Sequence, residues 1–330
     1  MKVSIFDVAR RAGLSVVTVS RVLNGAASVR DKNREKVLQA MKELDYRPNA
    51  SARSLAKGKT GIIGLTLRTL QDSFFDAVAK EINDRLAERG YYLALSVSPE
   101  GEGSPAHSTF KEDRVDGVLL LSPIREDESV LELKRRKIPV VLLDNQMRHS
   151  PAPSVIVDNF KGGFDAACHL IGLGHRRISH IAGPGPFLSS RERERGFRAA
   201  MAEAGLQPFS VERGTFRISS GYEIAERWIR ADRLPTAVFA ADDNIALGVM
   251  DACKNAGLRL PRDLSVVGFD DQPYAAEFRP GLTTVRQPAG QIARHGVELL
   301  LKRIEGAPQR SVTVKLEPEL VVRESAAPIA

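Results

Sequence analysis

The spacing of apolar residues changes once along the chain, near residue 61. Before that point, apolar positions recur three and four residues apart, as at Val19, Val22 and Leu23, which is typical of short amphipathic helices. After it, short apolar runs such as 61–67 alternate with amphipathic stretches. This alternation predicts two series of β-α units, with parallel sheets that helices cover on both faces.

Residues 1–48 are predicted to form three short helices around one small core. Ser4 and Asp7 are spaced as a capping box at the first helix, Gly13 allows a sharp turn after it, and Ser15 can N-cap the second. Two helices joined by such a turn describe a helix-turn-helix. The third helix, about 31–44, is expected to pack through the apolar residues Val37, Leu38, Met41 and Leu44.

In residues 61–330 the pattern predicts a two-lobed α/β core. Binding clefts in such folds lie at the carboxyl ends of the strands, so we expect a ligand between the lobes. The apolar runs predict strands at 61–67, 91–97, 117–121, 140–143, 155–157, 178–182, 237–240 and 265–269. The amphipathic stretches predict helices near 75–86, 163–173, 191–204, 221–230 and 244–256.

The second helix leaves an unusual set of side chains outside the predicted core. Adjacent valines at an exposed helix start are poorly solvated in water, but they can meet thymine methyl groups in a major groove. An arginine one turn later can bind guanine O6 and N7 with two hydrogen bonds. The alternative is that the valines pack on the third helix. The residues in question are Val16, Val17, Thr18, Ser20 and Arg21.

Charge supports a nucleic-acid partner for the head. The first 60 residues carry 13 Lys and Arg against 5 Asp and Glu, whereas the remaining 270 residues are close to neutral. A basic segment beside a neutral body is the footprint of a polyanion binder. The alternative is a soluble domain that is simply basic.

Composition excludes several other classes of protein. No run of 18 apolar residues occurs in the 330, which argues against a membrane protein, and the N-terminus lacks the apolar run of a signal peptide. We therefore expect a cytoplasmic location. Only Cys168 and Cys253 are present, so neither a disulfide framework nor a structural zinc site is expected.

Two motifs in the head carry a resemblance to the lactose-repressor (LacI/GalR) family of bacterial transcriptional regulators. They are residues 7–24, with the run Thr18 to Asn24, and residues 46–55, with Tyr46-Arg47-Pro48-Asn49. The resemblance implies that 49–60 is a hinge helix and linker that orders on DNA. It also implies that Leu55 wedges into the minor groove, where unstacking a base step bends the duplex.

The body is similar to the core of the same family, which resembles periplasmic sugar-binding proteins. The matching pieces include Val157-Asp158-Asn159, Arg193-Glu194-Arg195-Gly196-Phe197 and Gly268-Phe269-Asp270-Asp271. One stretch departs from the pattern: residues 96–113 contain two prolines and two glycines where the family usually has a helix, so we expect a loop there. The residues after Arg323 are expected to form a tail.

The resemblance maps two sets of binding residues onto this chain. The DNA-binding set is Ser4, Ser15, Val16, Val17, Thr18, Ser20, Arg21, Asn24, Asn49, Ala52, Arg53 and Leu55. The effector-binding set is Phe74, Phe75, Asp144, Ser189, Arg193, Phe216, Asp242 and Asp270. An arginine that donates and carboxylates that accept can hold a ring of hydroxyl groups, and a phenylalanine can cover an apolar sugar face or a base.

Structural roles compete with ligand binding at several of these positions. Arg193 could form a surface ion pair with its charged neighbours, Asp242 could only N-cap the following helix, and Asp270 could cap a loop. Phe74 and Phe216 could each belong to the core. These alternatives stay open on the sequence alone.

No residue pattern favours catalysis, a metal or a cofactor. The six histidines lack the spacing of a metal site or a triad, and 183–186 lacks the Lys-Ser/Thr of a P-loop.

From the head, the body and the resemblance together we expect a homodimeric, ligand-responsive regulator, most simply a repressor, that binds palindromic operator DNA on the nucleoid. Its effector would be a sugar or sugar derivative, or else a purine. The alternatives are a solute-binding protein without DNA function and a sugar-processing enzyme.

Overall fold

The computed structural model describes residues 3–23, 26, 28–46, 59–70, 72–97, 115–123, 126–144, 152–306 and 311–329. The chain divides into two compact units, Met1–Gly61 and Ile62–Ala330. Each unit is described by itself below. No helix among the described residues is long and apolar enough to cross a membrane. The hinge expected at 49–60 lies largely outside the described residues, as does nearly all of the loop expected at 96–113.

The head is a three-helix unit, α1 (Ile5–Ala12), α2 (Val16–Leu23) and α3 (Asp31–Glu43). The Asp7 carboxylate accepts hydrogen bonds from the Ser4 backbone N–H (3.0 Å) and hydroxyl (2.6 Å), which holds the start of α1. Gly13 ends that helix with a φ of 62°, a conformation that favours glycine. The Ser15 hydroxyl accepts from the Thr18 N–H (3.2 Å) and so caps α2.

The core of the head is made of small apolar residues, with Val8, Val19 and Val37 fully buried. One expectation for α3 is wrong: Leu38 is exposed, and Ala40 takes the buried position instead. The reason is the helical period, because Ala40 lies three residues after Val37 and shares its face, whereas Leu38 is rotated by about 100°.

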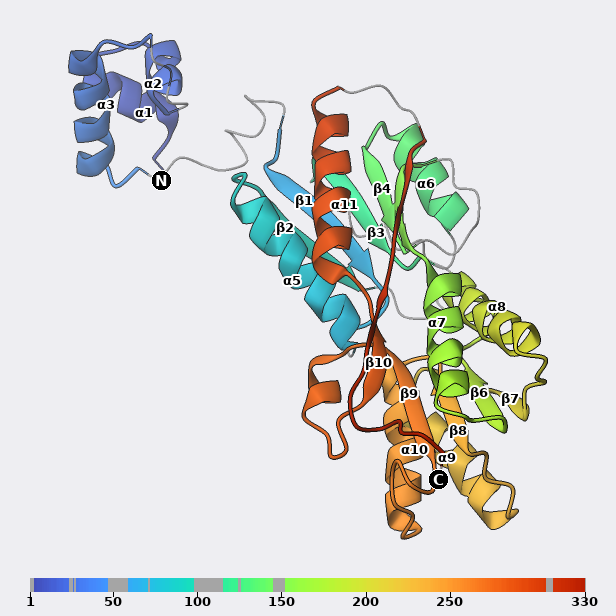
Figure 1. Ribbon diagram of the computed structural model, residues 1–330. Coiled ribbons are helices and arrows are strands. Elements are labelled where there is room, and N and C mark those ends of the chain that lie inside the picture. The colour runs from blue at the N-terminus through green and yellow to red at the C-terminus, as the bar shows by residue number, and fades with distance from the viewer. Residues whose placement is uncertain are drawn as a thin grey trace. The chain divides into compact units, whose positions relative to one another are not determined.

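The N-terminal lobe of the body is a six-stranded sheet in the order β11-β5-β4-β3-β1-β2. Its helices are α5 (Ser73–Ala87), α6 (Glu126–Arg135) and α11 (Ala289–Ile304). Alternate residues of β3 join different cores: Leu119 and Leu121 pack with residues of α5 and α11, and Val118 and Leu120 with residues of α6. Figure 1 shows these elements around the sheet. The strands are β1 (Ile62–Leu67), β2 (Tyr92–Val97), β3 (Gly117–Leu121), β4 (Val140–Leu143), β5 (Ser154–Val157) and β11 (Thr313–Leu316).

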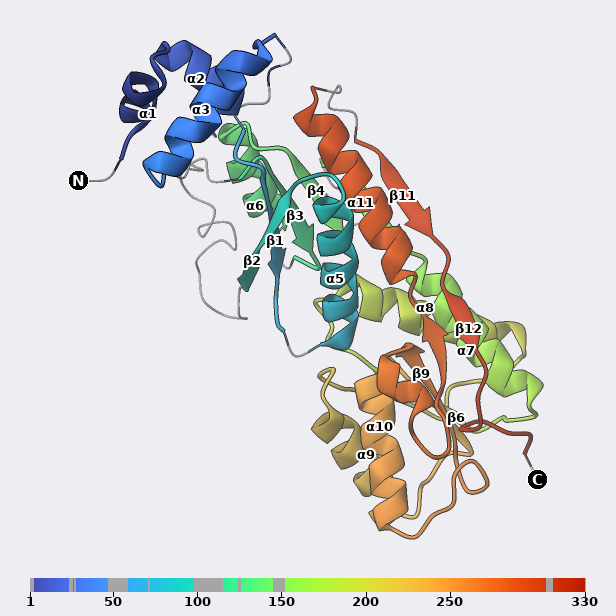
Figure 2. The same ribbon diagram turned by 90° about the vertical axis from the view of Figure 1, so that its left-hand side faces the viewer.

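The C-terminal lobe repeats this plan with the order β12-β10-β9-β8-β6-β7. The helices α7 (Asn159–Gly172) and α8 (Leu188–Glu203) share one core, and α9 (Ile218–Arg230) and α10 (Asp243–Asn255) share the other (Figure 2). The strands are β6 (Ile178–Ala182), β7 (Ser210–Arg213), β8 (Ala237–Ala240), β9 (Ser265–Asp270), β10 (Thr283–Arg286) and β12 (Glu319–Val321). Among the described pairs only β12 is antiparallel.

Three crossings of the chain join the lobes, from β5 to α7, from β10 to α11 and from β11 to β12. The residues after Arg323 are not a free tail, contrary to expectation. Ser325 is fully buried, donates to the Val266 carbonyl (2.6 Å) and accepts from the Thr283 N–H (2.8 Å). The Ile329 N–H reaches the Leu173 carbonyl at 3.0 Å. The end of the chain therefore belongs to the C-terminal lobe.

Candidate functional site: an exposed recognition helix and an inter-lobe cleft

The second helix of the head presents a mixed apolar and basic surface. Val17 is 61% exposed, and Arg21 is also exposed. Thr18 and Ser20 are half-buried on the flanks of this face. Val16 differs from the expectation, because it is half-buried and packs against the core of the head. Of the five residues of α2 that were predicted to face a groove, Val17 and Arg21 are therefore the exposed ones.

Two predicted DNA-contacting residues outside α2, Ser4 and Ser15, are among the described residues. Ser4 and Ser15 both take part in helix capping, although Ser15 is also exposed. Five further predicted residues, Asn24, Asn49, Ala52, Arg53 and Leu55, lie outside the described residues. An ion pair between Arg11 and Glu43 (2.5 Å) joins α1 to α3, and α2 takes no part in it.

In the body, predicted effector residues gather where strands of both lobes end. Asp144 follows β4 in the N-terminal lobe, while Asp242 follows β8 and Asp270 ends β9 in the C-terminal lobe. Carboxyl ends of parallel strands carry the loops that bind ligands in this class of fold. The cleft between the lobes is therefore lined by acidic side chains from both sides.

Arg193 is the buried cation of this cleft, so the surface ion-pair alternative is wrong. The side chain is only 5% exposed, although Arg191 and Arg195 on the same helix α8 are exposed. Its Nε donates to Asn159 Oδ1 (2.8 Å), one terminal nitrogen donates to the Ala241 carbonyl (2.6 Å), and the other lies 3.5 Å from Asp270 Oδ1. Its guanidinium carbon lies 3.6 Å from the centre of the Phe269 ring.

Burial governs the protonation of the carboxyl groups in the cleft. Removal from water raises the pKa of Asp270 to about 7, although the Arg193 charge opposes the rise. Burial also raises the pKa of Asp242 well above its usual range, and the nearby Asp270 charge adds to it. The pKa of Asp72 is raised for the same reason. Hydroxyl or N–H donors from a ligand would replace the water that these groups have lost.

A cavity of 1280 Å³ opens beside this cluster and is lined by both lobes. Arg68 and Asp72 come from the N-terminal lobe, and Phe187, Phe216 and Asn244 from the other. The Arg68 guanidinium carbon lies 4.2 Å from the Phe187 ring centre, which links the lobes across the opening. The ring centres of Phe187 and Phe216 are 5.6 Å apart. The two rings meet edge to face and form an apolar part of the cavity wall.

Of the eight predicted effector residues, Phe216 alone is among the residues that line that cavity. Asp144 and Ser189 line a second, 380 Å³ cavity together with Asn159. The Ser122 hydroxyl donates to the Asp144 carboxylate, so that carboxylate is partly satisfied within its own lobe. Arg193 contacts both Asn159 and Asp270 and so lies between the two groups of residues.

Two of the structural alternatives are correct descriptions of what the side chains do. Asp242 Oδ1 accepts from the Ile245 N–H (2.8 Å) and caps α10. Phe74, like Phe75, is buried in the core that α5 shares with β1, whereas Phe216 is only half-buried and packs against the core of α9 and α10. Asp270 does more than cap a loop, because it also accepts from Gln287 Nε2 (2.6 Å) and faces Arg193.

Sequence reasoning missed five residues that shape the cleft: Arg68, Asp72, Asn159, Phe187 and Gln287. Three of them follow strands, with Arg68 directly after β1, Asn159 two residues after β5 and Gln287 directly after β10. Their positions at strand ends were the signal that could have found them. Within the part of the chain that the structure describes, no group of three or more His, Cys, Asp or Glu side chains could hold a metal ion.

Comparison with known proteins assigns both units. Residues 4–49 match the model for bacterial regulatory proteins of the lacI family, and residues 167–326 match a periplasmic binding protein-like domain. The HTH-type transcriptional regulator DegA of Bacillus subtilis (strain 168) is 34% identical over 337 residues, which cover 100% of this chain and 99% of that one. This chain belongs to the lacI family. It is a ligand-responsive, DNA-binding transcriptional regulator rather than an enzyme.

A further relative and two solved structures are similar to this lacI-family regulator over nearly its whole length, and both structures contain a ligand. The HTH-type transcriptional repressor PurR of Edwardsiella ictaluri (strain 93-146) is 37% identical, with 98% of this chain and 97% of that one covered. The lac repressor dimer bound to operator and the anti-inducer ONPF superposes with a TM-score of 0.90 at 30% identity, covering 99% and 100%. The CelR–cellobiose complex gives a TM-score of 0.74 at 32% identity, covering 98% and 100%.

Proposed function

We propose that this regulator is a homodimeric repressor that binds a palindromic operator and releases or engages it in response to a small molecule. The observation that carries the proposal is the union, in one chain, of a helix-turn-helix head and a two-lobed cleft with a buried arginine and carboxylates. The structural similarity to a repressor dimer on its operator supports the dimeric state. Two heads at a fixed separation can read two half-sites.

The proposed reading surface is the exposed face of α2, with Val17 against thymine methyl groups and Arg21 on a guanine. The basic charge of the first 60 residues supplies contacts to phosphates. Residues 49–60 are proposed as the hinge, with Leu55 as the wedge in the minor groove. A repressor of this kind works on the nucleoid, in the cytoplasm.

The proposed effector is a sugar or sugar derivative. The cleft holds carboxylates from both lobes beside Arg193, and hydroxyl groups can donate to the former and accept from the latter. A relative solved with cellobiose supports this class. A purine is the second candidate, which the paired rings of Phe187 and Phe216 favour.

The test uses the full-length chain. Selection from a randomised DNA library should return palindromic sites, and sugars and purines should be screened by thermal shift. A true effector at about 100-fold excess over its Kd stabilises the protein by about 2.7 kcal/mol. The same compound should change operator affinity in fluorescence anisotropy. Recovery of no preferred site would refute the DNA-binding assignment, and a tight ligand without effect on operator affinity would refute the regulatory one.

A further inference from the structure

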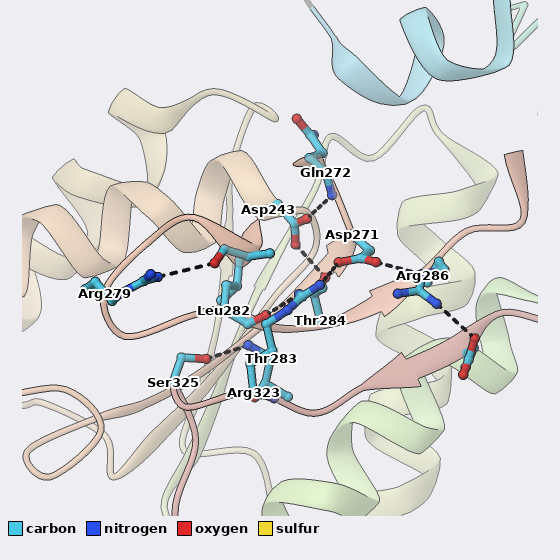
Figure 3. Close-up of polar contacts among 12 residues, drawn as sticks. Asp243, Asp271, Gln272, Arg279, Leu282, Thr283, Thr284, Arg286, Arg323 and Ser325 are labelled. Atoms are coloured by element: carbon cyan, nitrogen blue, oxygen red, sulfur yellow. Dashed lines mark hydrogen bonds and ion pairs between the residues drawn. The ribbon is translucent and has the colours of Figure 1, made fainter. Parts of the chain in front are cut away.

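A single hydrogen bond joins the first turn of α5 to the C-terminal lobe beside the effector cleft. The Ser73 hydroxyl, on the first residue of α5, donates to Gln272 Oε1 at 2.6 Å. Ser73 and Gln272 belong to different lobes, and Gln272 is 3% exposed. Figure 3 shows the Gln272 side chain directed toward the cyan helix and away from the sheet of its own lobe.

A buried carboxylate, that of Asp243, holds the backbone of Gln272 in place. Asp243 is fully buried at the start of α10, and its Oδ2 accepts from the Gln272 N–H (2.8 Å). Its Oδ1 accepts from the Thr284 hydroxyl (2.5 Å) on β10. A side chain at Gly268 would place its Cβ 2.3 Å from that oxygen, so the packing leaves no room for another residue there. These contacts pre-orient Gln272 for its partner on α5.

Three consecutive residues point to three different places. Asp270 reaches Arg193 in the effector cleft, while Asp271 is clamped by Arg286 (2.7 Å) and Arg323 (2.6 Å), as Figure 3 shows. Gln272 reaches α5. Asp270 and Asp271 both have positive φ, 110° and 54°, so the segment turns sharply within its own length. Asp270 in the effector cleft and Gln272 at α5 are therefore neighbours of the same clamped residue, Asp271.

On the α5 side of the bond, the residue before Ser73 lines the larger cavity. Asp72, the residue before Ser73, caps α5 by accepting from the Phe74 N–H (2.9 Å) and lines the 1280 Å³ cavity. Phe74 and Phe75 follow directly on the same turn. A bond that holds Ser73 therefore also sets where Asp72 lies relative to Asp270.

We propose that the Ser73–Gln272 pair is an inter-lobe latch that positions the first turn of α5 over the effector cleft and couples it to the Asp270–Asp271 segment. Both are positioning residues. Gln272 Nε2 is buried and has no hydrogen-bond partner among the described residues, so the side chain is held through its oxygen. The latch goes beyond the proposed function, because it acts whatever the effector is.

The test is hydrogen–deuterium exchange of the full-length chain without DNA or ligand. Gln272→Met keeps the size of the side chain but loses the acceptor, and Ser73→Ala loses the donor. Each should speed exchange in residues 74–79 about three- to tenfold, the range expected for one hydrogen bond that controls local opening. The double variant should be no faster than either single variant, because both remove the same bond. Gln291→Met, on the exposed start of α11, is the matched control and should leave residues 74–79 unchanged.

A purely local role for Gln272 gives a different result. If Gln272→Met speeds exchange only in residues 265–275, or if the effects of the two substitutions multiply in the double variant, the latch is refuted. If Gln272→Met fails to fold, the two variants Ser73→Ala and Ser73→Thr provide the test. Ser73→Ala must speed exchange in residues 270–276 of the opposite lobe, and Ser73→Thr, which keeps the hydroxyl, must not. Equal exchange in these two variants would also refute the latch. No outcome depends on the operator or the effector.

Discussion

The surroundings of Asp270 change its ionisation. It is nearly buried, faces Arg193 at 3.5 Å and accepts from Gln287 at 2.6 Å. Burial raises its pKa to about 7 despite the neighbouring arginine. Its ionisation state therefore changes near neutral pH, where an ordinary aspartate would be fully charged.

Replacing Asp270 with asparagine should change how stability depends on pH. The folded pKa of about 7 lies above the usual aspartate value near 4, so folding favours the protonated form. Its contribution is fully present below about pH 4 and is lost as the pH rises through about 7. Relative to Asp270→Asn, the wild type should therefore lose on the order of 2–4 kcal/mol of unfolding free energy across this interval.

The measurement is urea unfolding of the full chain at a series of pH values, followed by the fluorescence of Trp228, the only tryptophan, which lies in the C-terminal lobe. Asp251→Asn, which removes an exposed carboxyl group from α10, is the control and should keep the wild-type profile. Parallel profiles for wild type and Asp270→Asn would contradict the raised pKa.

Substitution of Arg21 separates the reading of bases from the attraction of phosphates. Arg21→Lys keeps the charge but cannot make the paired hydrogen bonds to a guanine. We expect a loss of about 1–3 kcal/mol in specific binding and of base preference at one position in each half-site, with the salt dependence of binding nearly unchanged. Selection from a randomised site library measures the base preference at each position. If that preference is unchanged in Arg21→Lys, Arg21 is not part of the reading surface.

At the scale of elements, glycines let helices of the C-terminal lobe pack closely. A Cβ at Gly196 on α8 would lie 2.1 Å from the Phe160 carbonyl oxygen of α7, and one at Gly163 on α7 would lie 2.2 Å from the Arg193 carbonyl oxygen. The same device joins α9 and α10 through Gly221 and Gly248. Close packing of α8 on α7 is what holds Arg193 in the cleft next to Asn159.

Gly196→Ala should therefore destabilise the C-terminal lobe by about 1–3 kcal/mol, because the obstructing atoms are backbone and cannot move aside. Gly172→Ala, at the last residue of α7, is the matched control. A Cβ there meets nothing within 4 Å, so alanine should stabilise by about 0.5–1 kcal/mol. Urea unfolding monitored at Trp228 measures both, and equal stabilities for the two variants would contradict the packing argument.

At the scale of the whole molecule, the two lobes are joined by three crossings and by contacts across the cleft. Besides the Ser73–Gln272 bond, the Arg68–Phe187 contact spans the opening. A ligand that bridges Asp270 and the N-terminal lobe changes the relative free energies of the open and closed arrangements. We expect the same ligand to change operator affinity, typically by about 1–3 kcal/mol or 5- to 150-fold, and linkage then requires that DNA changes ligand affinity by the same factor.

Arg193→Ala should abolish the response to the ligand while operator affinity without ligand stays within a few fold of wild type. The reason is that Arg193 contacts Asn159 and Asp270 in the cleft and is not part of the head. Fluorescence anisotropy on the operator, with and without the compound found in the screen, measures the response. Arg198→Ala, an exposed arginine one turn further along α8, should respond normally. A wild-type response of Arg193→Ala would show that the cleft assignment of this residue is wrong.

The sequence by itself determined the element types and the broad plan of this protein. Apolar period and turn chemistry predicted the three helices of the head and most strands of the body, because these signals are local. They missed α6, β7, β10, α11, β11 and β12, several of which are short or complete a sheet from far along the chain. The resemblance also named Arg193 and Asp270 as cleft residues.

Only the tertiary structure decided which side chains meet. Arg68, Asp72 and Phe187 converge on one cavity because the ends of separate strands and loops are brought together by sheet order, which no local pattern encodes. Burial likewise follows from packing between lobes, so the raised pKa of Asp270 could not be predicted from its neighbours in sequence. The contact between Ser73 and Gln272 joins residues 199 positions apart, and it exists because the two lobes fold against each other.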